Sequence, residues 1–121
     1  MVTINTRPHK KLIAWQKAIE LVKEIYKITE TFPRKEEFGL TAQMRRAAIS
    51  VPSNIAEGLT RKTNKDKLHF LNIAQASLSE IDTQLEISMN LTYIEETTFG
   101  EVEKRLIEVQ MLVSGLSRSM G

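Results

Sequence analysis

The side chains best suited to chemistry in this chain lie between residues 43 and 61, where cations and small polar groups share one helical segment. Arg45 and Arg46 are adjacent, and a guanidinium can bind phosphate or carboxylate through paired N–H donors. A polar stripe recurs along the segment at steps of three and four residues: Gln43, Arg46, Ser50, Asn54, Glu57 and Arg61. These residue types predict either phosphate binding or a structural polar network.

The two adjacent arginines need separate explanations, because neighbouring residues on a helix point about 100° apart. In a functional interpretation, they bind phosphate at a subunit face or pore. In a structural interpretation, at least one of them forms a buried or half-buried ion pair with Glu57 or Glu80 and fixes the helix register. We favour the structural interpretation for one arginine. The predicted polar network comprises Gln43, Ser50, Asn54, Glu57 and Glu80.

A second group of cations surrounds the predicted turn after residue 58, and consists of Arg61, Lys62, Lys65 and Lys67. With the paired arginines and with Lys10 and Lys11, it could form a basic patch for a polyanion. Few aromatic residues are interleaved, so the sequence does not indicate base stacking. The alternative is a solvated basic turn. The candidate nucleic-acid-binding residues are Arg45, Arg46, Arg61, Lys62 and Lys65.

Charge is distributed unevenly along the chain. Residues 1–67 hold 14 Lys and Arg against 7 Asp and Glu, a balance of 14 − 7 = +7. Residues 68–121 hold 3 against 8, a balance of 3 − 8 = −5. This split indicates either a basic face for a polyanion or basic and acidic faces that meet between subunits.

Composition excludes several kinds of chemistry. The chain has no cysteine, so it contains no disulfide, zinc thiolate site or thiol nucleophile. Asp66 and His69 form a single carboxylate–imidazole pair, whereas di-iron bundles need two such motifs and further carboxylates. There is no nucleophile elbow and no phosphate-binding loop. We therefore expect no enzyme activity, metal or cofactor. No targeting or membrane-spanning segment is visible, which predicts a cytoplasmic protein.

Apolar spacing predicts four helices, over residues 10–31, 41–58, 64–91 and 99–117, after an arm at residues 1–9. Expected N-caps are Thr41, Thr63 with Asp66, and Thr98 with Glu101. Pro52 lies inside the second helix and predicts a kink, with a clean break as the alternative.

Each predicted helix carries an apolar seam. The seam of the first helix comprises Leu12, Trp15, Ile19, Val22 and Tyr26, and that of the second comprises Leu40, Met44, Ala47, Val51 and Ile55. The third has Leu71, Ala74, Leu78, Ile81, Leu85 and Ser88, and the fourth has Phe99, Val102, Leu106, Val109, Val113 and Leu116. The expected fold is an all-α, antiparallel up-down-up-down four-helix bundle over residues 10–121, with a kinked second helix.

Residues 43–58 also carry a family resemblance. Gln-Met-Arg-Arg-Ala-Ala-Ile-Ser-Val-Pro-Ser-Asn-Ile-Ala-Glu-Gly is similar to a characteristic block of the 23S rRNA intervening-sequence protein family. The segments at residues 15–21, 32–33 and 70–81 fit the same family, so the resemblance covers nearly the whole chain.

The resemblance implies a four-helix bundle that assembles with itself, as a homopentamer. More distant relatives assist reverse transcriptases of diversity-generating retroelements and bind nucleic acid. The implied partners are therefore other copies of the chain, RNA or DNA, and a reverse transcriptase, with no membrane. The predicted function is a non-enzymatic accessory factor that binds nucleic acid by charge. The alternative is an oligomeric protein-interaction scaffold without a nucleic-acid role.

Overall fold

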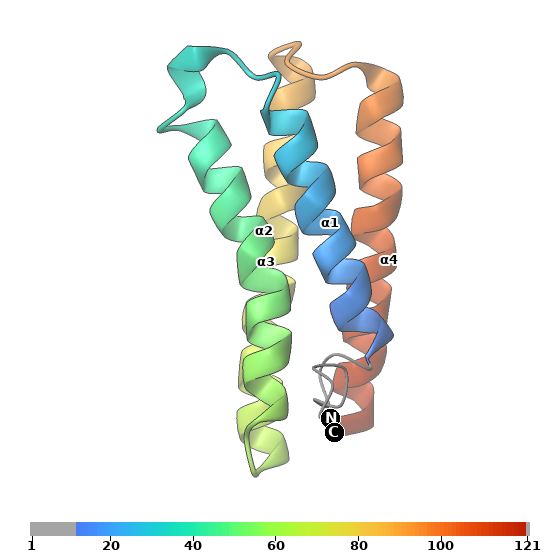
Figure 1. The fold of residues 1–121 in the computed structure, drawn as a ribbon. Helices are drawn as coiled ribbons and strands as arrows, with labels where there is room; N and C mark the ends of the chain where they lie inside the picture. The colour runs from blue at the N-terminus through green and yellow to red at the C-terminus, as the bar shows by residue number, and fades with distance from the viewer. Residues whose placement is uncertain (1–11, 121) are drawn as a thin grey trace, which may run out of the picture.

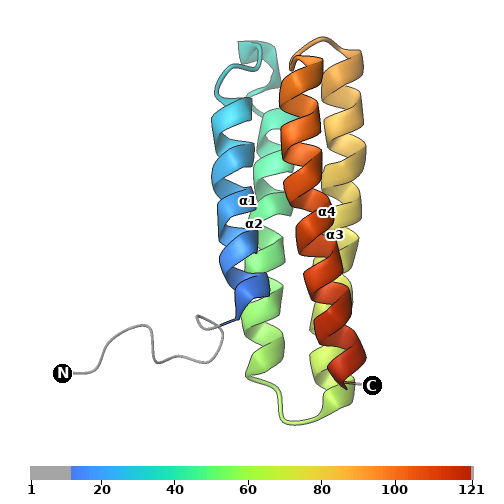
Figure 2. The same ribbon diagram turned by 90° about the vertical axis from the view of Figure 1, so that its right-hand side faces the viewer.

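The computed structural model describes residues 12–120, which form four α-helices and one short 3-10 helix. The elements are α1 (Ile13–Thr29), η3 (Arg34–Glu36), α2 (Leu40–Leu59), α3 (Asn64–Asn90) and α4 (Glu96–Met120). Consecutive helices run antiparallel, and α4 returns to lie beside α1 (Figure 1). The turn between α2 and α3 lies at the end of the bundle where α1 begins and α4 ends (Figure 2). The predicted all-α, up-down-up-down bundle is confirmed.

The core is built from one apolar stripe on each helix. All six predicted seam residues of α3 are buried, from Leu71 to Ser88. In α2, four of the five predicted seam residues are buried, and Leu40 is the exception. In α4, five of the six are buried, and Leu116 is the exception. Because burying one Leu, Ile or Val side chain contributes about 1.5–3 kcal/mol, these stripes dominate the stability of the fold.

The predicted seam of α1 is wrong. The stripe that α1 buries in the core comprises Ala14, Ala18, Leu21, Ile25 and Ile28. The predicted seam residues lie on the neighbouring flank of the helix. They are only partly buried, and Tyr26 is exposed. Helix α1 thus has two apolar stripes, and the two alanines of the buried one let α1 approach the other helices closely.

Two of the three predicted N-caps are also wrong. Helix α2 begins at Leu40, whose amide donates to Glu36 Oε1 at 3.2 Å, so Glu36 takes the role expected of Thr41. Helix α4 begins at Glu96, which places Thr98 inside the helix. The Thr63 cap is confirmed, because its hydroxyl accepts from the Asp66 amide at 3.1 Å. The predicted arm at residues 1–9 lies outside the described residues.

Helix α2 continues through Pro52 without the break considered as an alternative. Polar contacts surround the proline: Asn54 Nδ2 donates to the Ser50 carbonyl at 2.8 Å and to Ser50 Oγ at 2.9 Å. Ser77 of α3 donates to Ser50 Oγ at 2.8 Å. Proline removes one hydrogen bond from the helix, and these contacts join the weakened turn to α3.

A polar contact joins the two connections at the other end of the bundle. The Tyr93 hydroxyl donates to Glu36 Oε2 at 2.7 Å, and the Tyr93 ring lies 5.3 Å from the ring of Phe32. The hydrogen bonds from Tyr93 and from the Leu40 amide lower the pKa of Glu36. The hydrogen bond to Glu36 raises the pKa of Tyr93.

We predict that this contact makes stability depend on pH. Because the pKa of Glu36 is lowered on folding, its contribution is present above the ordinary carboxyl pKa of 4.5 and is lost as pH falls through the lowered value. Tyr93→Phe keeps the ring and removes the donor, so its thermal midpoint should lie below wild type at pH 6–7 and approach it at a pH below 4.5, as Glu36 takes up its proton. Thermal unfolding by circular dichroism measures this. Tyr26→Phe is the control, and an equal gap at both pH values would contradict the prediction.

Candidate nucleic-acid interface

The five predicted nucleic-acid-binding residues fall into two separate groups. Arg45 and Arg46 lie in the second turn of α2, and Arg61, Lys62 and Lys65 lie around the turn that follows the same helix. Fourteen residues of helix follow Arg45 before α2 ends at Leu59, a rise of about 21 Å, and Arg61 lies two residues further on. The structure therefore brings together the second group and does not join it to the first within one chain.

Arg45 is held by α1. Its Nε donates to Thr29 Oγ1 at 2.9 Å, and its Nη2 lies 3.4 Å from the Tyr26 carbonyl. Its guanidinium lies over the Tyr26 ring, 4.5 Å from the centroid. Arg45 is thus the half-buried arginine, but the predicted ion pair with Glu57 or Glu80 is wrong. The partners are a hydroxyl, a carbonyl and a ring of α1, which the sequence pattern of α2 could not reveal.

Arg46 is exposed and has no hydrogen bond or ion pair with any side chain of residues 12–120. It lies on the outward side of α2, one turn before Ile49, whose side chain is 44% exposed. A cation beside an exposed isoleucine is available for a partner outside the chain.

Arg61 is partly engaged within its own chain. Its Nη2 forms an ion pair with Glu57 Oε1 one turn earlier, and its guanidinium lies 4.6 Å from the centroid of the Phe70 ring. Its Nε is buried and has no hydrogen-bond partner among the described residues. The contact with Phe70 joins the end of α2 to the start of α3, so Arg61 has a structural role besides its charge.

Lys62 and Lys65 are exposed and form no ion pair within the described part of the chain. Residues 57–67 contain four cations and two carboxylates, which gives a net charge of 4 − 2 = +2. Arg118 lies in the last turn of α4, at the same end of the bundle. One chain therefore presents a small basic end with two freely available ammonium groups.

The predicted polar network is divided into local contacts. Ser50 and Asn54 bond to each other, and Ser77, which the sequence did not indicate, joins them to α3. Glu57 pairs with Arg61, and Glu80 accepts from Gln84 Nε2 at 3.3 Å. The side chain of Gln43 is exposed and makes none of these contacts. The five predicted residues therefore do not form one connected network.

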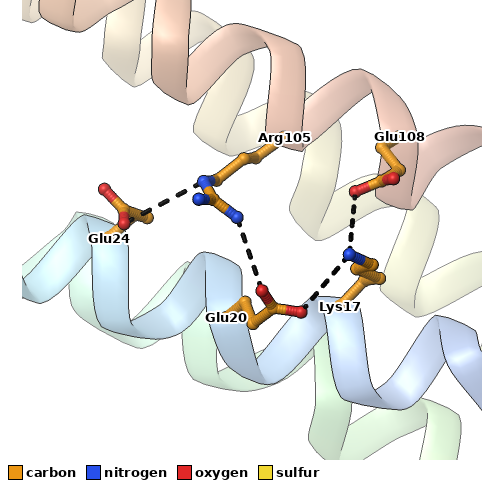
Figure 3. Close-up of polar contacts among 5 residues, drawn as sticks. All are labelled: Lys17, Glu20, Glu24, Arg105 and Glu108. Atoms are coloured by element: carbon orange, nitrogen blue, oxygen red, sulfur yellow. Dashed lines mark hydrogen bonds and ion pairs between the residues drawn. The ribbon is translucent and has the colours of Figure 1, made fainter.

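A further set of charged residues links α1 to α4 (Figure 3). Arg105 lies 3.5 Å from Glu20 and 3.9 Å from Glu24, and Lys17 lies 3.6 Å from Glu20 and 3.9 Å from Glu108. Each pair is partly exposed and contributes about 0–1 kcal/mol. These five residues of the α1–α4 side thus pair with one another, whereas Lys27, Glu101 and Lys104 beside them form no ion pair within residues 12–120.

The described residues offer no evident site for other chemistry. Within residues 12–120, no group of three or more His, Asp or Glu side chains is arranged to hold a metal ion. In the same range, no helix is both long and apolar enough to cross a bilayer. The hollow beside the α1–α4 ion pairs has a volume of about 490 Å³ and is lined by charged side chains of both signs.

Comparison with known proteins identifies relatives of the chain. A family model described as 23S rRNA-intervening sequence protein matches residues 10–115. A solved structure of a protein of unknown function from the S23 ribosomal protein family of Bacteroides thetaiotaomicron is similar, with a TM-score of 0.81 and 21% sequence identity. The similarity covers 88% of this chain and 96% of that one, and it supports the fold. The comparison with curated proteins gave no match.

We predict that the adjacent arginines differ in their effect on stability. Arg45→Ala removes two hydrogen bonds and a cation–π contact, and should lower the free energy of unfolding by about 1–2 kcal/mol. Arg46→Ala removes neither, and should change it by less than about 0.5 kcal/mol. Urea unfolding of both variants at a concentration where the chain is monomeric measures the difference. Equal losses would show that Arg46 also contributes to the fold of the single chain.

Proposed function

The chain belongs to the 23S rRNA-intervening sequence protein family, and from that membership we propose that it is a non-enzymatic, self-assembling protein that binds nucleic acid. Binding is by charge, with little preference for sequence. In this proposal the protein acts as an accessory factor, associated with rRNA intervening sequences or with a reverse-transcribing element. The assembly is a homopentamer, as the resemblance of the sequence implies.

The observation that carries the proposal is the basic end formed by the α2–α3 turn. Lys62 and Lys65 are exposed there without partners among the described residues, and Arg61 is held beside them by Glu57 and Phe70. Each phosphate that a lysine or arginine neutralises releases condensed counterions, which provides most of the affinity of non-specific binding. A net charge of +2 on one turn is small, so binding depends on several copies presenting their turns together.

Little sequence preference follows from the same geometry. Sequence-tolerant or sequence-specific binding of single strands uses exposed aromatic rings on which bases stack. Of the two rings beside the basic turn, Phe70 is partly buried and covered by the Arg61 guanidinium, and the exposed His69 ring packs edge-on against Phe70 at 5.1 Å. The turn therefore offers mainly charge to a phosphate backbone, with His69 as its single exposed ring.

The second candidate function is an oligomeric scaffold that binds proteins. Its support is the exposed apolar surface on the helices, which includes Met111 at 69% and Ile107 at 47% exposed. The two functions respond differently to salt. Nucleic-acid binding weakens steeply as salt rises, whereas association through apolar side chains does not.

We predict that single-stranded and structured RNA bind with a steep salt dependence, and that matched DNA binds similarly. The double variant Lys62→Glu/Lys65→Glu should weaken binding by at least about tenfold. It should also reduce the slope of log K against log salt by roughly 1.4 for each contacting subunit. Fluorescence anisotropy between 50 and 200 mM salt measures both.

The matched control is Lys35→Glu/Lys104→Glu, which makes the same change in net charge on residues away from the turn. It should retain most of the affinity. Absence of RNA and DNA binding at low salt by the assembled wild-type protein would contradict the nucleic-acid proposal and favour the scaffold. Equal losses in both double variants would show that net charge, and not the α2–α3 turn, determines binding.

A further inference from the structure

Helix α1 carries more apolar surface than the bundle core uses. Its buried stripe, from Ala14 to Ile28, faces the other helices. A second stripe at steps of three and four residues lies on the flank toward α2, and its middle members are Trp15, Ile19 and Val22. These three are partly buried in the single chain. Trp15 and Val22 pack partly against the core, so this stripe forms an apolar border of the bundle and not part of its centre.

The second stripe of α1 lines a hollow with α2. The hollow has a volume of about 330 Å³, and its lining is apolar except for one serine: Trp15, Ile19, Val22, Ile49, Pro52, Ser53 and Ala56. Aromatic side chains are enriched at the centres of protein interfaces, where they provide anchors of low conformational entropy. The composition of this α1–α2 hollow is that of an interface and not that of solvated helix surface.

The opposite side of the bundle carries an apolar ridge on α4, formed by the exposed side chains of Ile107 and Met111. Helix α1 lies beside α2 and α4, and α3 lies beside α2 and α4, with no close approach of the backbones across either diagonal among the described residues. The α3–α4 side therefore lies opposite the α1–α2 hollow (Figures 1 and 2). On α4, Ile107 and Met111 are 47% and 69% exposed, lie one turn apart, and border a hollow that Gln110, Ser114 and Arg118 also line.

The charges of the two sides are complementary. Helices α1 and α2 hold five Lys and Arg against three Glu, which gives +2, and α3 and α4 hold five against eight Asp and Glu, which gives −3. The cations on the outward side of α1 and α2 are Lys23 and Arg46, both without ion pairs in the described residues. On α3 and α4, the carboxylates of Asp82, Glu86 and Glu103 are likewise unpaired there, and they outnumber Arg118, the cation that lines the hollow beside Met111. The ion pairs between α1 and α4 lie on a different side (Figure 3).

From these features we infer that the α1–α2 hollow of one copy receives Ile107 and Met111 of a second copy. The contact joins two different faces, so it is heterologous, with Lys23 and Arg46 facing carboxylates of the neighbour. This inference rests on the proposed self-assembly and specifies the two surfaces through which the copies bind each other. A ring with an odd number of subunits requires heterologous contacts, because isologous contacts pair subunits two by two.

The heterologous contact has a consequence for the basic end. In a closed ring, one rotation axis relates all subunits, so every copy has the same end on the same side of the ring. All α2–α3 turns then lie on one rim, and the small charge of a single turn is multiplied by the number of subunits. This geometry supplies the multivalent contact with phosphates that the proposed function needs.

Complementation between two damaged faces tests the inference. Ile49→Asp places a carboxylate in the hollow, and Met111→Asp places one on the protruding face. Alone, each variant should fall from the assembled state to single chains of 13.8 kDa, because each keeps only one intact face. When the two are mixed, the intact hollow of Met111→Asp accepts the intact ridge of Ile49→Asp. The mixture should therefore stop at a heterodimer of 2 × 13.8 = 27.6 kDa, measured by native mass spectrometry.

Phe38→Asp is the matched control. Phe38 is 90% exposed in the connection between α1 and α2 and belongs to neither face, so this variant should assemble as wild type does. Retention of wild-type mass by Ile49→Asp or Met111→Asp would overturn the inferred contact and leave self-assembly intact. Two monomeric variants that fail to combine would also overturn it. A wild-type chain that is monomeric at all concentrations would instead contradict the self-assembly itself.

Cysteine cross-linking tests the contact if Ile49→Asp fails to fold. The chain has no cysteine, so only introduced thiols can react. We expect Ile49→Cys and Met111→Cys, purified separately and mixed, to form a disulfide between unlike chains. Disulfides between like chains only would show an isologous contact and overturn the inference, and no disulfide in an assembled protein would place the interface elsewhere.

Discussion

A helix in a four-helix bundle has room for one stripe of side chains in the shared core, and this limit determines what the rest of the molecule presents. In α1 two apolar stripes compete for that position. The stripe with two alanines, Ala14 and Ala18, allows close approach and places Leu21 and Ile25 in the centre of the bundle. The stripe with Trp15 is bulkier and remains at the flank, where it is partly buried and lines the hollow with α2. As a result, the surface between α1 and α2 is a hollow lined by apolar side chains and not a polar, solvated helix surface.

The same limit explains how much of the fold the sequence predicts. Helices α2, α3 and α4 each have one dominant apolar stripe, and the spacing of residues such as Leu78, Leu106 and Val51 identifies their buried faces correctly. In α1 the heptad spacing of large residues indicates the wrong stripe, because hydrophobicity alone favours Trp15 over Ala18. The volume available between packed helices decides in favour of alanine, and that volume depends on the other three helices.

Contacts between distant side chains are the other part that the sequence does not predict. Arg45 is held by Thr29 and Tyr26, and Glu36 replaces Thr41 as the group that satisfies the first amide of α2. Both contacts depend on the path that the connection between α1 and α2 takes in space. The spacing of residues within one helix does not predict that path. The Thr63 cap was predictable because donor and acceptor are three residues apart within one turn. The basic turn was predictable as a cluster for the same local reason, whereas its separation from Arg45 is a consequence of helix length.

In the assembly that we propose, charge and apolar surface have different tasks, and the two candidate functions become compatible. The net charge of one α2–α3 turn, +2, is too small to hold a polyanion against physiological salt by itself. The apolar hollow and ridge can bring copies together at salt concentrations where surface charges are screened over about 8–10 Å. If assembly depends on the apolar faces and binding depends on the repeated turns, the same protein is a scaffold through its apolar faces and a nucleic-acid-binding protein through its basic turns. The scaffold then exists to raise the local density of Lys62 and Lys65, and its loss abolishes binding although every lysine remains in place.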